Sequence, residues 1–270
     1  MVFLAQVASG AHSAGAEGGA VFMSLFHHVL PHQIGSVAGI PVFNFQIFQV
    51  IALVLMVLIF GALRTRMSLE RPGLFARIFR GWVIWIREEM VYPIMGREEG
   101  RKFLPYFLYL FFFIAFMNLL GLVPSGVAAT GSLYVTGAMA ATSLALFFGA
   151  GMKVNGVFGF FRSLVPHGLP AWLFPLMFIL EFVGIFFKAF ALMIRLFANM
   201  TGGHLALLSF LGLIFFFAGM IGKMAYALAV PSVGFAVFIM IVESFVALLQ
   251  AYIFTILTIV FTAMYMHPDH

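Results

Sequence analysis

The feature that most constrains the fold is a predominantly apolar run of almost fifty residues from Trp172 to Gly219. Its main interruptions are Glu181, Lys188, Arg195, Asn199, Gly202, Gly203 and His204. As a helix rising about 1.5 Å per residue, the run is about 70 Å long, whereas the hydrocarbon core of a bilayer is about 30 Å thick. The run therefore predicts a membrane-embedded helix that is strongly tilted or bent.

The composition extends this conclusion to the whole chain. Of the 270 residues, 64% are hydrophobic and only 9% are charged, whereas a soluble domain has about 25% charged residues. The apolar stretches suit helices of about 20 residues per crossing rather than the alternating ten-residue strands of a membrane barrel. We therefore expect an all-α polytopic membrane protein. The absence of cysteine excludes disulfides and thiolate metal sites.

The pattern along the chain predicts a single membrane domain over residues 42–270, preceded by an extramembrane lead-in at 1–41. Five membrane-embedded helices are expected, the last two long and tilted, at about 42–63, 103–123, 133–152, 172–219 and 231–266. Residues 73–95 interleave tryptophan and isoleucine with arginine and glutamate. This pattern is typical of an amphipathic helix that lies on the membrane surface.

The distribution of positive charge predicts the topology. Nine of the fourteen lysines and arginines fall between Arg64 and Lys102, so this stretch is expected on the cytoplasmic side. The N-terminus is then outside and the C-terminus cytoplasmic, in a bacterial inner membrane or, alternatively, an organellar one. The net charge of +5 fits this topology and contact with lipid headgroups better than binding of nucleic acid.

Arg195 is the strongest candidate functional residue, because an arginine near the bilayer centre costs roughly 3 kcal/mol and marks a functional site. Glu181, Lys188 and Arg195 are spaced by seven residues, which places them on one helical face. Each step of seven residues is about 10.5 Å along the axis. We therefore expect these side chains to be too far apart for direct pairing.

The second long helix carries Glu243 and Gln250. In an antiparallel hairpin, the pairs Arg195 with Gln250 and His204 with Glu243 require nearly the same register. This register supplies no carboxylate to Arg195, so its counter-charge is expected from water or another subunit.

The polar groups divide by depth, with Glu181 and Lys188 toward the inner face and His204 and Glu243 toward the outer face. Histidine and glutamate take up and release protons, whereas arginine stays protonated. The pattern therefore predicts two proton half-paths separated by Arg195. Asn199 and Gln250 are expected as supporting polar groups. The alternatives left open are that these two amides only bridge helices, that His204 and Glu243 form a helix clamp, and that Lys188 snorkels to the interface.

Two segments together resemble the a subunit of rotary F-type ATP synthases. The first is Arg195-Leu-Phe-Ala-Asn-Met200, with Glu181 and Lys188 before it and His204, Glu243 and Gln250 after it; the second is Asn118-Leu-Leu-Gly-Leu-Val-Pro124. The resemblance covers about 103–266. Some bacterial members carry the acid on the first long helix and the imidazole on the second, and here the two are exchanged.

The resemblance implies a proton-translocating stator in which Arg195 faces the carboxylate of a rotating c-ring. His204 and Glu243 are then implied for the outer half-channel, and Glu181 and Lys188 for the inner one. The implied partners are the c-ring, b-type peripheral stalk subunits, other ATP synthase subunits and membrane lipid. No nucleic acid, nucleotide, metal or cofactor is implied for this chain, and the ATP chemistry belongs to other subunits.

The nearest alternative function is a stand-alone proton or cation transporter, which also needs charges at the membrane midplane. The absence of an inverted repeat and of an internal counter-ion for Arg195 argues against it. A haem oxidoreductase needs paired axial histidines, and only His204 lies at membrane depth. His27, His28 and His32 lack an acidic second shell, so we expect no metal there.

Overall fold

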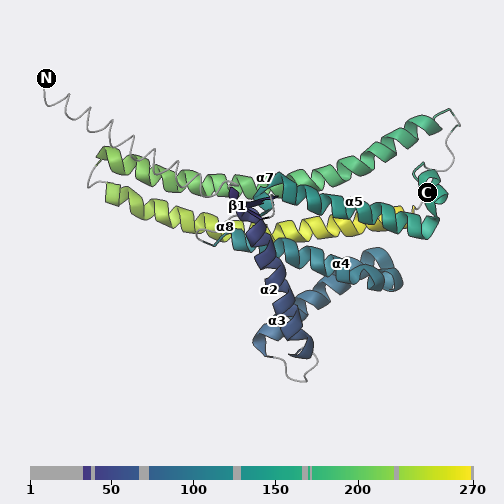
Figure 1. The fold of residues 1–270 in the computed structure, drawn as a ribbon, viewed down its shortest axis with the longest axis horizontal. Helices are drawn as coiled ribbons and strands as arrows, with labels where there is room; N and C mark the ends of the chain where they lie inside the picture. The colour runs from purple at the N-terminus through teal and green to yellow at the C-terminus, as the bar shows by residue number, and fades with distance from the viewer. Residues whose placement is uncertain are drawn as a thin grey trace. The chain divides into compact units, whose positions relative to one another are not determined.

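The computed structural model describes residues 33–37, 40–66, 73–123, 129–165, 170, 172–221 and 225–268. Most of the lead-in, with His27, His28 and His32, lies outside these residues, as does Pro124. Within them the chain is very largely helical (Figure 1), which confirms the predicted all-α fold. Five helical segments of the described chain are long and apolar enough to cross a membrane, as the sequence predicts.

The helices follow the expected order. They are α2 (Asn44–Arg66), α3 (Leu74–Trp85), α4 (Tyr92–Gly121), α5 (Leu133–Asn155), α6 (Val157–Ser163), α7 (Phe174–Ile221) and α8 (Ala225–Met266). A π-helical turn (Ile86–Val91) joins α3 to α4, and a short 3-10 turn (Ala129–Gly131) precedes α5. The sequence predicts a start for the last helix at Pro231, but α8 begins at Ala225. Membrane helices tolerate an internal proline, which explains the difference.

The predicted surface helix at 73–95 corresponds to α3, the π-helical turn and the first residues of α4. The chain then bends sharply at Gly96, whose φ of 74° is in the region that favours glycine. The bend is visible in Figure 1 as the turn between α3 and the main part of α4. Glycine at this position therefore separates the amphipathic segment from the rest of α4, which becomes apolar from Phe103 onward.

The described residues group into two compact units. The first contains residues up to Val50, Met117–Ser132 and Ala198–Leu248, and the second contains Ile51–Phe116, Leu133–Phe197 and Leu249 onward. The helices α7 and α8 each contribute one part to the first unit and one to the second. The second unit therefore holds Arg195 and Gln250, and the first unit holds His204 and Glu243.

Phenylalanine builds much of the core of the second unit. Phe112 of α4 packs against Phe60 of α2 and Phe79 of α3, with ring centroids 4.9 Å and 5.8 Å apart. On α5, Phe147 packs against Phe261 of α8, and Phe148 against Phe182 of α7. Within this unit, α5 therefore runs beside the first half of α7 and the end of α8 (Figure 1).

Asn155 fixes the end of α8 in the same unit. Its side-chain amide donates to the carbonyl oxygens of Tyr265 and Met266, each at 3.2 Å. The last carbonyls of a helix have no partner within the helix, so this amide acts as a cap supplied by α5. The contact also holds the last turn of α8 beside α5.

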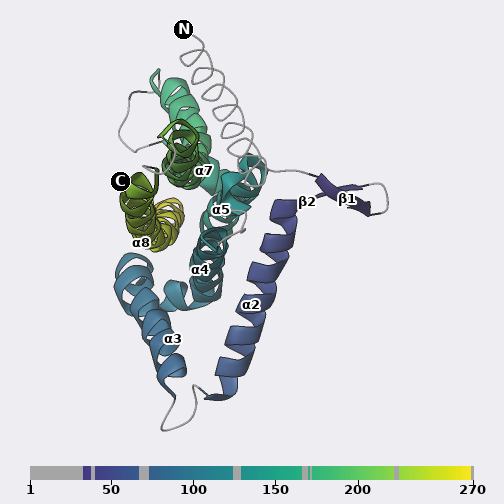
Figure 2. The same cartoon turned by 90° about the vertical axis from the view of Figure 1, so that its left-hand side faces the viewer.

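The first unit contains two short strands that were not expected from the sequence. These strands, β1 (Gln33–Val37) and β2 (Ile40–Phe43), form an antiparallel pair. Figure 2 shows this hairpin directly before the start of α2. The end of the lead-in therefore forms a small β-hairpin, and α2 starts immediately after it.

Candidate functional site

Arg195 lies on an exposed face of α7 in the second unit. It lines an open groove of about 430 Å³ between α7 and α8. Lys188, seven residues earlier on α7, lines the same groove. The remaining walls are almost wholly apolar and include Phe187, Leu257 and Phe261. The seven-residue spacing therefore places both cations along one groove, as expected from the sequence.

No ion pair involves Arg195 among the described residues of its own unit. The nearest acidic candidate on the same face, Glu181, pairs with Lys188 instead. The groove therefore presents a guanidinium to whatever lies on this face of the helix. This agrees with the expectation that Arg195 takes its counter-charge from outside the two long helices.

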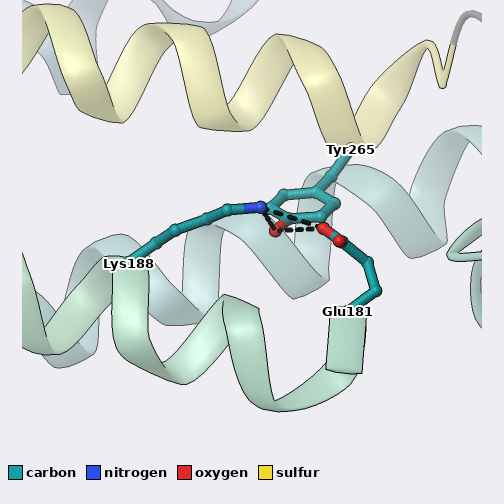
Figure 3. Close-up of polar contacts among 3 residues, drawn as sticks. All are labelled: Glu181, Lys188 and Tyr265. Atoms are coloured by element: carbon teal, nitrogen blue, oxygen red, sulfur yellow. Dashed lines mark hydrogen bonds and ion pairs between the residues drawn. The ribbon is translucent and has the colours of Figure 1, made fainter. Parts of the chain in front are cut away.

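Glu181 and Lys188 correct one prediction. The seven-residue spacing predicts that they are too far apart for pairing, but Lys188 Nζ lies 2.9 Å from Glu181 Oε1 (Figure 3). Side chains on a helix point toward its N-terminus, so the long lysine leans back toward Glu181. Both side chains are half-buried, and their combined length spans the two helical turns.

Tyr265 of α8 is a third member of this cluster, which the sequence patterns did not predict. Its hydroxyl accepts a hydrogen bond from Lys188 Nζ at 2.7 Å and donates to Glu181 Oε1 at 3.5 Å. Figure 3 shows the three polar groups converging from α7 and α8. The sequence does contain a signal for this contact. The register that pairs Arg195 with Gln250 places Met264, the neighbour of Tyr265, opposite Glu181.

His204 and Glu243 come together in the first unit, as the predicted register requires. The carboxylate of Glu243 packs against Gly203, the residue before His204. The exposed fractions are only 9% for His204 and 7% for Glu243. The structure therefore confirms this half of the predicted register.

Three polar atoms of this pair are buried without a hydrogen-bond partner in the described part of the chain: His204 Nε2 and both carboxylate oxygens of Glu243. A buried polar group without a partner is costly, and a buried unpaired charge is far more so. The described part of the chain leaves these polar atoms of the buried pair unsatisfied.

Asn118, in the motif near the end of α4, supports the same region. Its side-chain oxygen accepts from the Thr130 hydroxyl at 2.7 Å, and its amide donates to the carbonyl of Ala247 at 3.3 Å. Ala247 lies one turn beyond Glu243 on α8. Asn118 and Thr130 are almost fully buried, so the contact holds α4 against α8 next to Glu243.

The two predicted supporting amides are placed differently. Gln250 is buried in the second unit, with an exposed fraction of 4%. Asn199 lies on the exposed face of α7 in the first unit. Both side chains make interactions, so their supporting role stays a prediction.

Comparison with known proteins identifies the family to which this arrangement belongs. Residues 46–263 match the family described as ATP synthase A chain, which is most of the chain. The chain belongs to this family. The resemblance predicted from Arg195 and its neighbouring motif is therefore confirmed, and with it the role of a proton-translocating stator subunit of the membrane sector, Fo.

Three bacterial relatives, each named ATP synthase subunit a, illustrate the similarity. The protein of Myxococcus xanthus is 40% identical over 212 residues, which are 77% of this chain and 68% of the relative. That of Anaeromyxobacter sp. strain Fw109-5 is 37% identical over 234 residues, 86% of this chain and 55% of the relative. That of Chloroherpeton thalassium is 40% identical over 203 residues, 74% of this chain and 58% of the relative. The chain thus spans less than two thirds of the latter two.

This family membership settles several coarser predictions. The five membrane-length helices and the bacterial relatives identify an integral protein of a bacterial plasma membrane. Other ATP synthase subunits are its partners, and the chain is one component of a larger enzyme complex.

Proposed function

We propose that this ATP synthase A chain carries protons through two offset half-channels separated by Arg195, which faces the carboxylate of a c-ring. The observation that carries the proposal is the position of Arg195, exposed on α7 beside an apolar groove and without an ion pair in its unit. An arginine at membrane depth needs a counter-charge, and a carboxylate on a neighbouring ring supplies it.

Arg195 acts as the barrier between the half-channels. Its guanidinium stays protonated at all working pH values, so it repels protons and does not relay them. A ring carboxylate that reaches Arg195 is held in its charged form by the opposite charge. It therefore releases its proton on one side of Arg195 and takes up another on the other side, and the ring turns in between.

The outer half-channel ends at His204 and Glu243. Their buried and unpartnered polar atoms support a role in passing protons between the outer face and the ring. The imidazole and the carboxylate can each bind and release a proton. The contact between Gly203 and Glu243 keeps the two groups in neighbouring positions.

The inner half-channel contains Glu181 and Lys188. Lys188 lines the groove that also contains Arg195, and its ammonium group is paired with Glu181. A proton leaving a ring carboxylate near Arg195 therefore has a path along the groove to a titratable group.

The chain binds no nucleotide in this proposal, and the ATP chemistry takes place on other subunits. The N-terminus lies outside and the C-terminus in the cytoplasm, with the segment at 73–95 on the inner membrane surface. The b-type peripheral stalk subunits hold the chain still while the c-ring rotates.

The proposal is tested by ATP-driven proton pumping in membrane vesicles that carry Arg195→Ala or Arg195→Lys. Pumping is expected to fall to background with Arg195→Ala, because the barrier and the ring-facing charge are both removed. Arg195→Lys is expected to pump poorly, because lysine is a point charge that releases its proton more readily when buried.

Arg162→Ala is the matched control, because Arg162 is an exposed arginine of α6 in the same unit. The amount of assembled complex is measured in parallel for every variant. Normal pumping by an assembled Arg195→Ala complex would show that the arginine is only structural. Proton transport by the purified chain alone would favour the stand-alone transporter instead.

A further inference from the structure

We infer that Tyr265 is a positioning residue of the inner half-channel: its hydroxyl holds the ammonium of Lys188 on the carboxylate of Glu181. The inference rests on the proposed function, in which Glu181 and Lys188 form the inner proton path. It extends that function to a residue of α8 that carries no charge.

Three contacts join these side chains into a closed triangle (Figure 3). Lys188 Nζ lies 2.9 Å from Glu181 Oε1 and 2.7 Å from the Tyr265 hydroxyl, and this hydroxyl lies 3.5 Å from the same carboxylate oxygen. The Lys188 ammonium also lies 5.0 Å from the centre of the Tyr265 ring. Tyr265 therefore contacts the cation with both its hydroxyl and its aromatic face.

The pair between Glu181 and Lys188 needs such support. The two residues lie seven positions apart on one helix, so both side chains extend along the axis to meet. Holding a long lysine in one extended conformation costs side-chain entropy. A second hydrogen-bond acceptor on the neighbouring helix offsets this cost and selects one position for the ammonium.

Tyr265 is itself held firmly. It is 5% exposed, and Asn155 caps the carbonyls of Tyr265 and Met266. Gly151 permits this approach, because a Cβ atom there would lie 3.0 Å from the Tyr265 carbonyl oxygen and 2.6 Å from a ring carbon of Phe160. The backbone of Tyr265 is thus held by α5, separately from the contacts that its hydroxyl makes with α7.

The position of the Lys188 ammonium matters because Lys188 lines the same groove as Arg195. A loose ammonium near the inner end of the groove competes with Arg195 for a passing ring carboxylate. Held on Glu181 by Tyr265, it leaves Arg195 as the cation presented to the ring. Loss of the hydroxyl therefore affects exchange at the inner face and leaves the outer half-channel unchanged.

The test uses Tyr265→Phe in the whole ATP synthase, in inverted membrane vesicles. Tyr252→Phe is the matched control, because Tyr252 lies on the same helix with its ring packed on Trp85 at 5.6 Å. Proton pumping per assembled complex is measured while the pH on the inner and outer faces is varied separately. We expect Tyr265→Phe to lower the rate by about tenfold or more, as expected for loss of one hydrogen bond to a charged group. Its dependence on inner-face pH is expected to change, and its dependence on outer-face pH is not.

Two further variants separate positioning from a general structural role. Lys188→Gln combined with Tyr265→Phe is expected to lose little more than either change alone, because both remove the same contact. Asn155→Ala is expected to reproduce the inner-face effect with Tyr265 intact. If Tyr265→Phe assembles poorly, the Asn155→Ala result decides the question.

The inference is overturned if Tyr265→Phe behaves like Tyr252→Phe, or if both pH dependences shift together. If Arg195→Ala still abolishes pumping in that case, the proposed function stands although this inference fails. If Arg195→Ala itself pumps normally, the proposed function fails, and this inference fails with it.

Discussion

The carboxylate of Glu243 lies directly against the backbone of Gly203. A Cβ atom at Gly203 would lie 2.8 Å from the carboxyl carbon of Glu243, closer than side chains approach one another. His204 follows Gly203, so this single contact sets the spacing between the acid and the imidazole. The absence of a side chain at Gly203 is thus a condition for the outer pair.

Gly203→Ala is therefore expected to displace the Glu243 side chain and to lower proton pumping by about tenfold, because overpacking of this kind costs typically 1–3 kcal/mol. Gly202→Ala is the matched control, since nothing lies within 4 Å of a Cβ atom at Gly202. Pumping per assembled complex distinguishes the two. Equal pumping rates for both variants would show that the contact between Gly203 and Glu243 does not affect proton transport.

Glu243→Gln tests whether the outer pair carries protons or only joins two helices. Glutamine has the same shape and can form hydrogen bonds, but it cannot take up a proton at working pH. We expect the complex to assemble and pumping to fall by about 100-fold or more, the range for loss of a proton-transfer group. Glu98→Gln, at an exposed position of α4, serves as the control. Full activity of Glu243→Gln would support the helix clamp instead.

Gly151→Ala is expected to destabilise the second unit by about 1–3 kcal/mol, because the new methyl group overlaps the ring of Phe160. Gly149→Ala on the same helix has open space around its Cβ position and is expected to be neutral. The measurement is the thermal transition of the purified complex, and the release of this subunit is the signal that is monitored. An unchanged transition temperature for Gly151→Ala would contradict the close packing of α5 on α6.

Asn118→Ala is expected to destabilise the first unit by about 1–3 kcal/mol, because it leaves the buried Thr130 hydroxyl without its acceptor. Thr130→Val removes the other partner of the same hydrogen bond. The two changes together are expected to cost less than the sum of the separate effects. Thermal stability of the complex, compared across the three variants, gives the coupling. Strict additivity would show that the two side chains act independently.

Much of the architecture was predictable from local sequence patterns. The limits of α5 and α7 agree with their apolar runs to within a few residues, because the length of an apolar stretch decides whether it can cross a bilayer. The bend at Gly96 and the β-hairpin before α2 were not predicted, since each depends on backbone geometry that composition does not report. The seven-residue spacing correctly placed Lys188 and Arg195 on one groove.

The sequence by itself determined which residues are charged at membrane depth and which helical face they share, because helical periodicity alone sets that face. Only the tertiary structure decided which partners they meet. Lys188 reaches Glu181 because it leans back along α7 and meets a hydroxyl from α8, and Glu243 reaches Gly203 because the glycine has no side chain. Both contacts depend on side-chain direction and on the distance between two helices, quantities that arise only when the helices pack.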